Sequence, residues 1–222
     1  KLGYEGDFPE NLKYQVEYSR HVYEHIAPYT LLPAGTVVPI GADGNLDFVA
    51  PVGFSLFTDG VIGAPGGKHT DSRLNLVFNY TGFDEHNLRV AVGSLEQKID
   101  TREYKNFGPG ILDGTQPVVD GTVTDVSDTS FVYLENKTRD AVYFSFQDEW
   151  ALSNDWELTY GVRYDDYSDF GDAVNPRAAL VWQTRHNLST KFLYGKAFRA
   201  PSFVELGLSN NPVSIGNPSL IE

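Results

Sequence analysis

The sequence predicts an all-β protein of the antiparallel, up-and-down transmembrane β-barrel class, and the 222 residues form a fragment of about seven strands of a larger barrel. Three observations support this prediction. Apolar and polar residues alternate in stretches of about ten residues. Short and long links between these stretches alternate along the chain, and all three tryptophans lie beside short links.

The alternation is clearest in two neighbouring stretches. In residues 141–152 the even positions carry large apolar side chains such as Phe144 and Trp150, whereas Ser145 is at an odd position. In residues 156–166 the even positions again carry the aromatic and aliphatic side chains. Successive side chains of a strand point to opposite faces, so each stretch is predicted to be a strand with one apolar and one polar face.

The same pattern recurs more weakly in five other stretches, which are residues 12–20, 74–80, 88–92, 176–183 and 188–198. No comparable stretch has apolar residues at helical spacing. We therefore expect seven strands and essentially no helix.

The links between the strands indicate how the sheet is placed. Three pairs of strands are joined by tight turns, at 84–87, 153–155 and 184–187. The links between these pairs are 25–69, 104–138, 169–174 and the tail from residue 200. All of them except 169–174 are long. In an antiparallel meander, successive links lie at opposite ends of the sheet. This asymmetry is typical of outer-membrane barrels, which have short periplasmic turns and long extracellular loops. A β-sandwich has shorter strands and lacks this asymmetry.

The tryptophans indicate where the strands meet the membrane surface. Trp150 and Trp156 flank the turn at 153–155, and Trp182 precedes the turn at 184–187. Membrane barrels place aromatic side chains at the lipid–water interface. Asp148 does not fit this pattern, because it falls on the apolar face of its strand. Two explanations stay open: Asp148 lies at the interface, or a β-bulge turns it toward the lumen.

Composition excludes several classes. The formal net charge is −13 and no basic patch occurs, which argues against nucleic acid as a partner. The chain has no cysteine, which excludes a disulfide scaffold and a zinc–thiolate site. No run of about 18 apolar residues could form a membrane helix.

Candidate metal and catalytic groups are few. Asp165, Asp166, Asp169 and Asp172 concentrate carboxylates near the long-loop end and form a weak candidate for calcium, with solvated loop acids as the alternative. The histidines lack zinc-enzyme spacing, and nothing in the sequence places Asp165 and Asp169 in a glycosidase cleft. We expect no enzymatic activity and no cofactor beyond a possible structural calcium.

The C-terminal stretch "YGKAFRAPSFVELGLSNNPVSIGNPSLIE", residues 194–222, resembles a segment of TonB-dependent outer-membrane receptors. In that family a strand runs to an FRAPS-like turn, and a loop then ends in a GNP-x-L-x-x-E motif that leads into the next strand. The similarity extends upstream to residue 139, and over 1–138 it rests on strand pattern and loop length. The family-motif positions are Phe198, Arg199, Ala200, Pro201, Gly216, Asn217 and Pro218.

The resemblance implies a barrel of about 22 strands with a plug inside, in the bacterial outer membrane. Residues 1–222 would then be a partial β-barrel domain without the plug and the last strands. The implied function is energised import of a scarce nutrient, most often a ferric siderophore. The implied partners are the TonB energy-transducing complex, acting through the plug region, the siderophore or another small nutrient, and outer-membrane lipid.

Other interpretations stay open at this point. The chain could be a soluble all-β binding module such as a lectin-like sandwich, or an outer-membrane barrel that is passive or enzymatic. Arg199 could face the lumen and pair with the plug, or it could be a solvated charge at the end of a strand.

Overall fold

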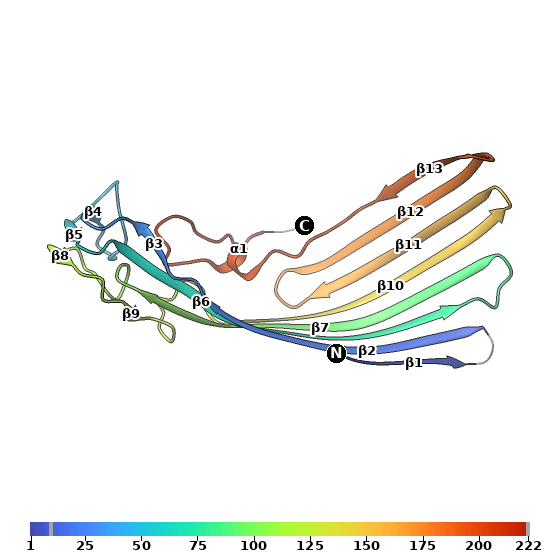
Figure 1. Cartoon of the computed structure of the whole chain (residues 1–222), viewed down its shortest axis with the longest axis horizontal. Helices are drawn as coiled ribbons and strands as arrows, with labels where there is room; N and C mark the ends of the chain where they lie inside the picture. Colours follow the sequence, from blue (N-terminus) through green and yellow to red (C-terminus); the bar gives the residue numbers. More distant parts are fainter. Residues whose placement is uncertain (9–10, 221–222) are drawn as a thin grey trace.

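A computed structural model describes residues 1–8 and 11–220 and shows one large, curved antiparallel sheet (Figure 1). Each strand of the main path pairs with the next one along the chain, which confirms the predicted all-β, up-and-down arrangement. The path is β1 (Leu2–Phe8), β2 (Leu12–Ile26), β6 (Val61–Tyr80), β7 (His86–Lys105), β10 (Lys137–Ser153), β11 (Trp156–Tyr167), β12 (Gly171–Arg185) and β13 (Leu188–Gly195). The sheet is open, with β1 and β13 at its edges.

The links confirm the predicted polarity. Residues 81–85, 154–155 and 186–187 form short connections at one end of the sheet, and the long segments 27–60 and 106–136 lie at the other end (Figure 1). A β-sandwich would need a second sheet against the apolar face. Within residues 1–8 and 11–220 no such sheet is present.

Two strand predictions are wrong. The main path has eight strands rather than seven, because β1 was not recognised. The link predicted as 25–69 ends earlier, since β6 already begins at Val61. Pro65, Gly66 and Gly67 give this part of β6 the composition of a loop. At Gly66 an added Cβ would collide with the carbonyl of His25, so glycine permits a close backbone approach to β2.

The long links contain structure that was expected to be loop. β3 (Tyr29–Leu32) and β9 (Thr124–Asp125) extend the main sheet, beside β6 and β7 respectively. A second sheet has the order β4 (Thr36–Ile40), β5 (Gly53–Phe57) and β8 (Val118–Val119). One face of this small sheet, together with neighbouring residues, forms the main apolar core, which comprises Val38, Ile40, Phe57, Val61, Phe107 and Leu112.

One short helix, α1 (Phe203–Gly207), follows the last strand and was not predicted. No helix among the described residues is long and apolar enough to cross a membrane.

The strand register produces continuous rows of side chains of one kind. On the outer face, one row crosses seven strands through paired residues, which are Tyr4, Val16, Leu76, Val92, Phe144, Tyr164 and Val174. On the inner face, the adjacent row runs through Glu17, Asn75, Gly93, Tyr143 and Asp165. The predicted separation into one apolar and one polar face is therefore confirmed.

Asp148 stays on the outer face. The pairing of β10 with β11 is regular from Ala141 to Ala151, so the second of the two explanations left open, a bulge that turns Asp148 toward the lumen, is excluded. The Asp148 Oδ2 atom accepts a hydrogen bond from the Tyr160 hydroxyl at 3.0 Å and lies 2.8 Å from His86 Nδ1. The His86 ring stacks on Trp150. Asp148 is 1% exposed, and both partners contact its Oδ2 atom, whereas its buried Oδ1 atom has no hydrogen-bond partner among the described residues. The two contacts offset part of the cost of burying the carboxylate.

The register can be tested with a pair of neighbouring substitutions. Phe144→Arg would place a charge on the face predicted to contact lipid, and we expect it to cost about 2–4 kcal/mol of folding free energy near the bilayer midplane. Ser145→Arg points into the polar inner face, so its cost should be much smaller. Folding of both variants into liposomes measures the difference. Equal costs would contradict the assignment of the two faces.

Candidate functional site

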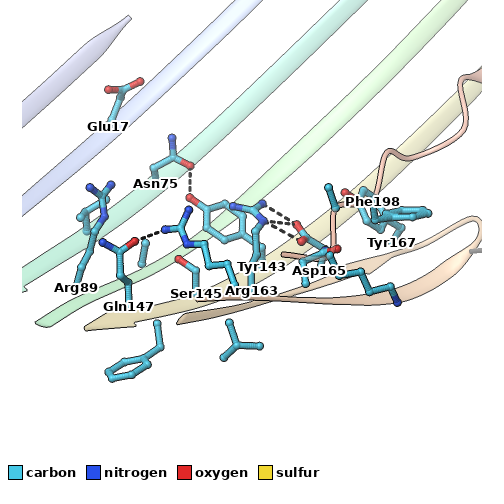
Figure 2. Close-up of a pocket in the computed structure, with 18 of the residues that line it drawn as sticks. Glu17, Asn75, Arg89, Tyr143, Ser145, Gln147, Arg163, Asp165, Tyr167 and Phe198 are labelled. Atoms are coloured by element: carbon cyan, nitrogen blue, oxygen red, sulfur yellow. Dashed lines mark hydrogen bonds and ion pairs between the residues drawn. The ribbon is translucent and has the colours of Figure 1, made fainter. Parts of the chain in front are cut away.

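The inner face of the sheet contains a hollow of about 790 Å³ (Figure 2). Because every second side chain of each strand points inward, six strands contribute to one surface. The polar and aromatic lining residues are Gln15, Glu17, Asn75, Arg89, Tyr143, Ser145, Phe146, Gln147, Arg163, Asp165, Tyr167, Asn175, Arg177, Lys196 and Phe198.

Tyr143 and Arg163 form the centre of this surface. The Tyr143 ring lies against Gly93, where an added Cβ would clash with the ring, and its hydroxyl donates a hydrogen bond to Asn75 Oδ1 at 2.8 Å. The Arg163 guanidinium lies 3.9 Å from the centre of the Tyr143 ring. Its Nε and Nη2 atoms donate to the two carboxylate oxygens of Asp165. These contacts hold the side chains at the middle of the sheet's inner face in one arrangement, and Arg163 balances the negative charge of Asp165.

Three other cations line the hollow. Arg177 donates a hydrogen bond to Gln147 Oε1. The Arg89 side chain has neither a hydrogen bond nor an ion pair with any described residue, and Figure 2 shows it at the edge of the hollow. Lys196 also lines the hollow. Among the described residues, the buried Asn175 Oδ1 atom has no hydrogen-bond partner.

The chemistry of the hollow is that of a binding surface. Its guanidinium groups can donate hydrogen bonds to an anionic or strongly polar group, and Asn175 can accept one. One serine, Ser145, lines the hollow. The described lining includes no histidine that could act as its general base.

The FRAPS positions lead directly into α1. Ser202 and Glu205 form a capping box, in which each side chain contacts the backbone of the other residue. Arg199 donates to both carboxylate oxygens of Glu205, at 3.0 and 2.7 Å. The hydrogen bond from Arg199, followed by those from Ser202, lowers the pKa of Glu205 to about 2. Arg199 therefore pairs within its own segment, and its side chain is exposed.

The GNP positions meet the same unit. The Gly216 N–H donates to Leu208 O at 2.7 Å, and the Asn217 N–H donates to Glu205 O at 2.8 Å. An added Cβ at Gly216 would clash with the backbone of residues 206–208, so the close approach requires glycine. The structure thus brings the two halves of the sequence motif together around α1.

The remaining motif positions have local roles. Phe198 packs against Phe170 with ring centres 5.4 Å apart and borders the hollow. The Ala200 carbonyl accepts a hydrogen bond from Arg199 at 3.3 Å, and Pro201 is buried before the helix cap. Pro218 lies in the turn closed by Leu220 N–H and Asn217 O. The last residue of the motif, at position 222, is outside the described residues.

The tail also docks on the second long loop, which sequence reasoning missed. Asn210 Nδ2 donates to the carbonyls of Ser130 and Val132 at 2.9 and 3.0 Å. Lys105, which is fully buried, donates to the carbonyls of Phe131 and Asn210 and forms an ion pair with Glu103. One lysine at the end of β7 thereby joins the strand, the loop and the tail. The sequence did contain a signal for the ion pair: Glu103 and Lys105 are two residues apart, and such residues lie on the same face of a strand.

Arg139 makes the corresponding contact at the start of β10. Its guanidinium donates to both oxygens of Asp169 and lies 4.9 Å from the centre of the Phe203 ring. Arg139 is 3% exposed, and it connects α1 to the turn between β11 and β12.

The proposed calcium ligands do not converge. Asp165 pairs with Arg163, and Asp169 pairs with Arg139. Asp166 and Asp172 are opposite each other in the register of β11 and β12. Asp166 directly follows Asp165, so the side chains of Asp166 and Asp172 point to the other face of the sheet. No group of three or more possible metal ligands occurs in the described part of the chain. The geometry therefore does not support a calcium site formed by these four carboxylates.

The Arg199–Glu205 pair predicts a pH dependence of the tail. The pKa of Glu205 falls from 4.5 to about 2 on folding, so its contribution to stability is complete above about pH 4.5 and is lost as the pH falls through about 2. Because the chain has no cysteine, a single nitroxide label on a Val213→Cys variant reports tail mobility. We expect mobility to rise only near pH 2. In the Glu205→Gln variant the tail should be mobile already at neutral pH. If tail mobility instead rises around pH 4.5 while Arg199 and Glu205 are both intact, the assignment is wrong.

Comparison with known proteins agrees with this architecture. The chain matches the family described as "TonB dependent receptor-like, beta-barrel" over residues 1–220. Iron-regulated outer membrane virulence proteins from two strains of Vibrio cholerae serotype O1 are 34% identical to it over 79 residues, which is 33% of this chain and 12% of theirs. The chain thus aligns with only a small part of these relatives.

A solved structure of a ferric enterobactin receptor mutant from Pseudomonas aeruginosa, in complex with enterobactin, is 13% identical, with a TM-score of 0.34. The match covers 92% of this chain and 42% of that receptor chain. The family match over residues 1–220 decides the assignment: the chain belongs to the β-barrel of the TonB-dependent receptor family, whose members lie in the bacterial outer membrane.

Proposed function

We propose that the receptor containing this barrel segment imports a scarce nutrient across the outer membrane with energy from a TonB complex. The observation that supports this proposal best is the two-faced wall. A continuous apolar row faces outward, and a polar hollow with Arg89 and Arg177 in its lining faces the lumen. Such a wall separates lipid from a polar lumen that can hold a ligand or a plug.

The nutrient that we propose is a ferric siderophore. The Vibrio cholerae relatives are named as iron-regulated proteins, which supports a link to iron supply. Guanidinium groups in the hollow are suited to the oxygen-rich surface of an iron chelate or to carboxylates of a plug. The import requires no covalent step, so the residues of the wall act by binding and positioning.

The plug is the proposed link to the energy source. It would lie against the inner face, where the hollow offers unmet hydrogen-bonding capacity at Arg89 and Asn175. Rearrangement of the plug by the TonB complex would then release the ligand toward the periplasm.

Uptake of radioactive iron by whole cells tests the function. Iron-starved cells that carry the full receptor as their siderophore receptor should take up a ferric siderophore, and removal of the TonB complex should abolish uptake. Ferric hydroxamate and ferric catecholate siderophores serve as the two probes. Uptake that continues without the TonB complex would indicate a passive barrel and would overturn the proposal.

The contribution of the hollow is tested in the same assay. The double variant Arg89→Gln and Arg177→Gln removes two guanidinium groups from the wall, and we expect uptake to fall by about tenfold, equivalent to about 1.4 kcal/mol. Arg185→Gln, in β12 beside the short turn, is the matched control and should have no effect. Surface display of all variants is measured with antibody. Normal uptake by the displayed double variant would exclude the hollow from transport.

A further inference from the structure

The outer face of the small sheet carries a continuous group of apolar side chains at the end of the molecule. Val37, Phe54 and Val118 are 58%, 64% and 56% exposed. The register joins them, because Val37 and Val118 both pair with Leu56, and Pro39 pairs with Phe54. We call these five residues, Val37, Pro39, Phe54, Leu56 and Val118, the tip face. The opposite side of the same strands is the buried core.

The loop before β5 exposes two further apolar side chains. Phe48 and Val49, in the segment that leads into β5, are 75% and 94% exposed. Phe48 follows Asp47, whose carboxylate accepts hydrogen bonds from the backbone of Val49 and Ala50 and so fixes the turn. Isolated exposed apolar residues are normal on protein surfaces, whereas a connected group marks an interaction site.

The surroundings of the tip face are acidic. Residues 27–60 and 106–136 contain no lysine, arginine or histidine. Their acidic residues are Asp43, Asp47, Asp59, Asp113, Asp120, Asp125, Asp128 and Glu135. Two neighbouring cations are buried in other ion pairs, Lys105 with Glu103 and Arg139 with Asp169. Lys137 pairs with Glu135 and offsets the charge of that one acid.

Several of these acids have a pKa below the ordinary value of an aspartate. Hydrogen bonds from the backbone of Ala50 and Val49 lower the pKa of Asp47. Bonds from Thr115 lower the pKa of Asp113, and bonds from Thr122 lower the pKa of Asp120. The tip therefore combines exposed apolar side chains with an excess of carboxylates.

We propose that the tip face binds a basic, amphipathic segment of a partner polypeptide. Apolar side chains of the partner cover Val37, Phe54 and Val118, and its lysine or arginine side chains face the surrounding carboxylates. A second copy of this chain would bring the same acidic loops together and is disfavoured by repulsion. An anionic lipid surface is disfavoured for the same reason.

Peptide binding to the full receptor tests this proposal. The receptor is placed in nanodiscs of zwitterionic phosphatidylcholine, and empty nanodiscs give the background. The probe is a fluorescein-labelled peptide of about twelve residues that alternates lysine and valine, so that one side of an extended strand is basic and the other apolar. A lysine–serine peptide and a glutamate–valine peptide separate the contributions of charge and apolar surface.

The lysine–valine peptide should bind at least about tenfold more tightly than either control peptide, because it alone matches both features of the surface. Phe54→Gln should weaken its binding by about tenfold, as expected for loss of a central aromatic contact. Ile215→Gln changes another residue, 84% exposed on the tail, and should leave binding unchanged. The triple variant Asp47→Asn, Asp59→Asn and Asp120→Asn keeps the turn acceptors but should weaken binding and reduce its salt dependence.

Three results would overturn the proposal. Equal binding of the lysine–serine peptide would show that charge alone attracts the probe. Absence of binding above empty nanodiscs would show that another part of the receptor covers the tip face. Self-association of the receptor that Phe54→Gln abolishes in sedimentation would assign the face to a second copy. None of these readouts requires transport, so the test is independent of the proposed function.

Discussion

The structure depends on the strict alternation of side chains across eight strands that stay in register. Because β2, β6, β7, β10, β11 and β12 pair without a break over their central parts, an odd or even position on one strand meets its counterpart on the next. A shift by one residue in any strand would move its apolar set to the lumen and its polar set to lipid. The outer row through Phe144 and the inner hollow around Tyr143 are therefore two consequences of one register.

Two buried cations extend this wall into the long loops. Lys105 and Arg139 lie near the loop ends of β7 and β10, and both are almost completely buried. A buried charge is tolerated only when its donors are satisfied. Lys105 meets this requirement with Glu103 and two backbone carbonyls, and Arg139 meets it with Asp169 and aromatic rings. The tail beyond β13 supplies part of each site, so the tail and the second loop are ordered together.

Sequence patterns predicted the wall better than the loops, and the reason is physical. Alternation is a local property, and it identified the strands around Phe144 and Trp156 because lipid and lumen impose a period of two. It failed for residues 61–69, where glycines at close backbone contacts have the composition of a loop. It also could not predict the contact between Lys105 and Asn210, since the acceptor is a backbone carbonyl 105 residues away and any residue type could supply it.

Asp148 shows how an ambiguous signal is resolved by its partners. The sequence placed a carboxylate on the apolar face and left open whether the strand bulges. His86 and Tyr160 come from the two neighbouring strands, and the regular register brings both to the same carboxylate oxygen. Once these partners are paired, the carboxylate can remain on the outer face without a bulge. The same oxygen then joins β7, β10 and β11 close to the stacked His86 and Trp150.

The fold also places acidic and basic side chains in different parts of the molecule. Although the net charge is −13, the loop segments 27–60 and 106–136 carry acids without any basic residue, while Arg89, Arg163, Arg177 and Lys196 meet in the hollow. Lys105 and Arg139, at the loop ends of β7 and β10, are buried in structural pairs and add little to the field at the surface. On the proposed import route from the long-loop end, a molecule would meet the negative, partly apolar tip before it reaches the arginines of the hollow. The small sheet and the main sheet therefore present surfaces of opposite charge, because the acids of the loops and the cations of the inner face are kept apart.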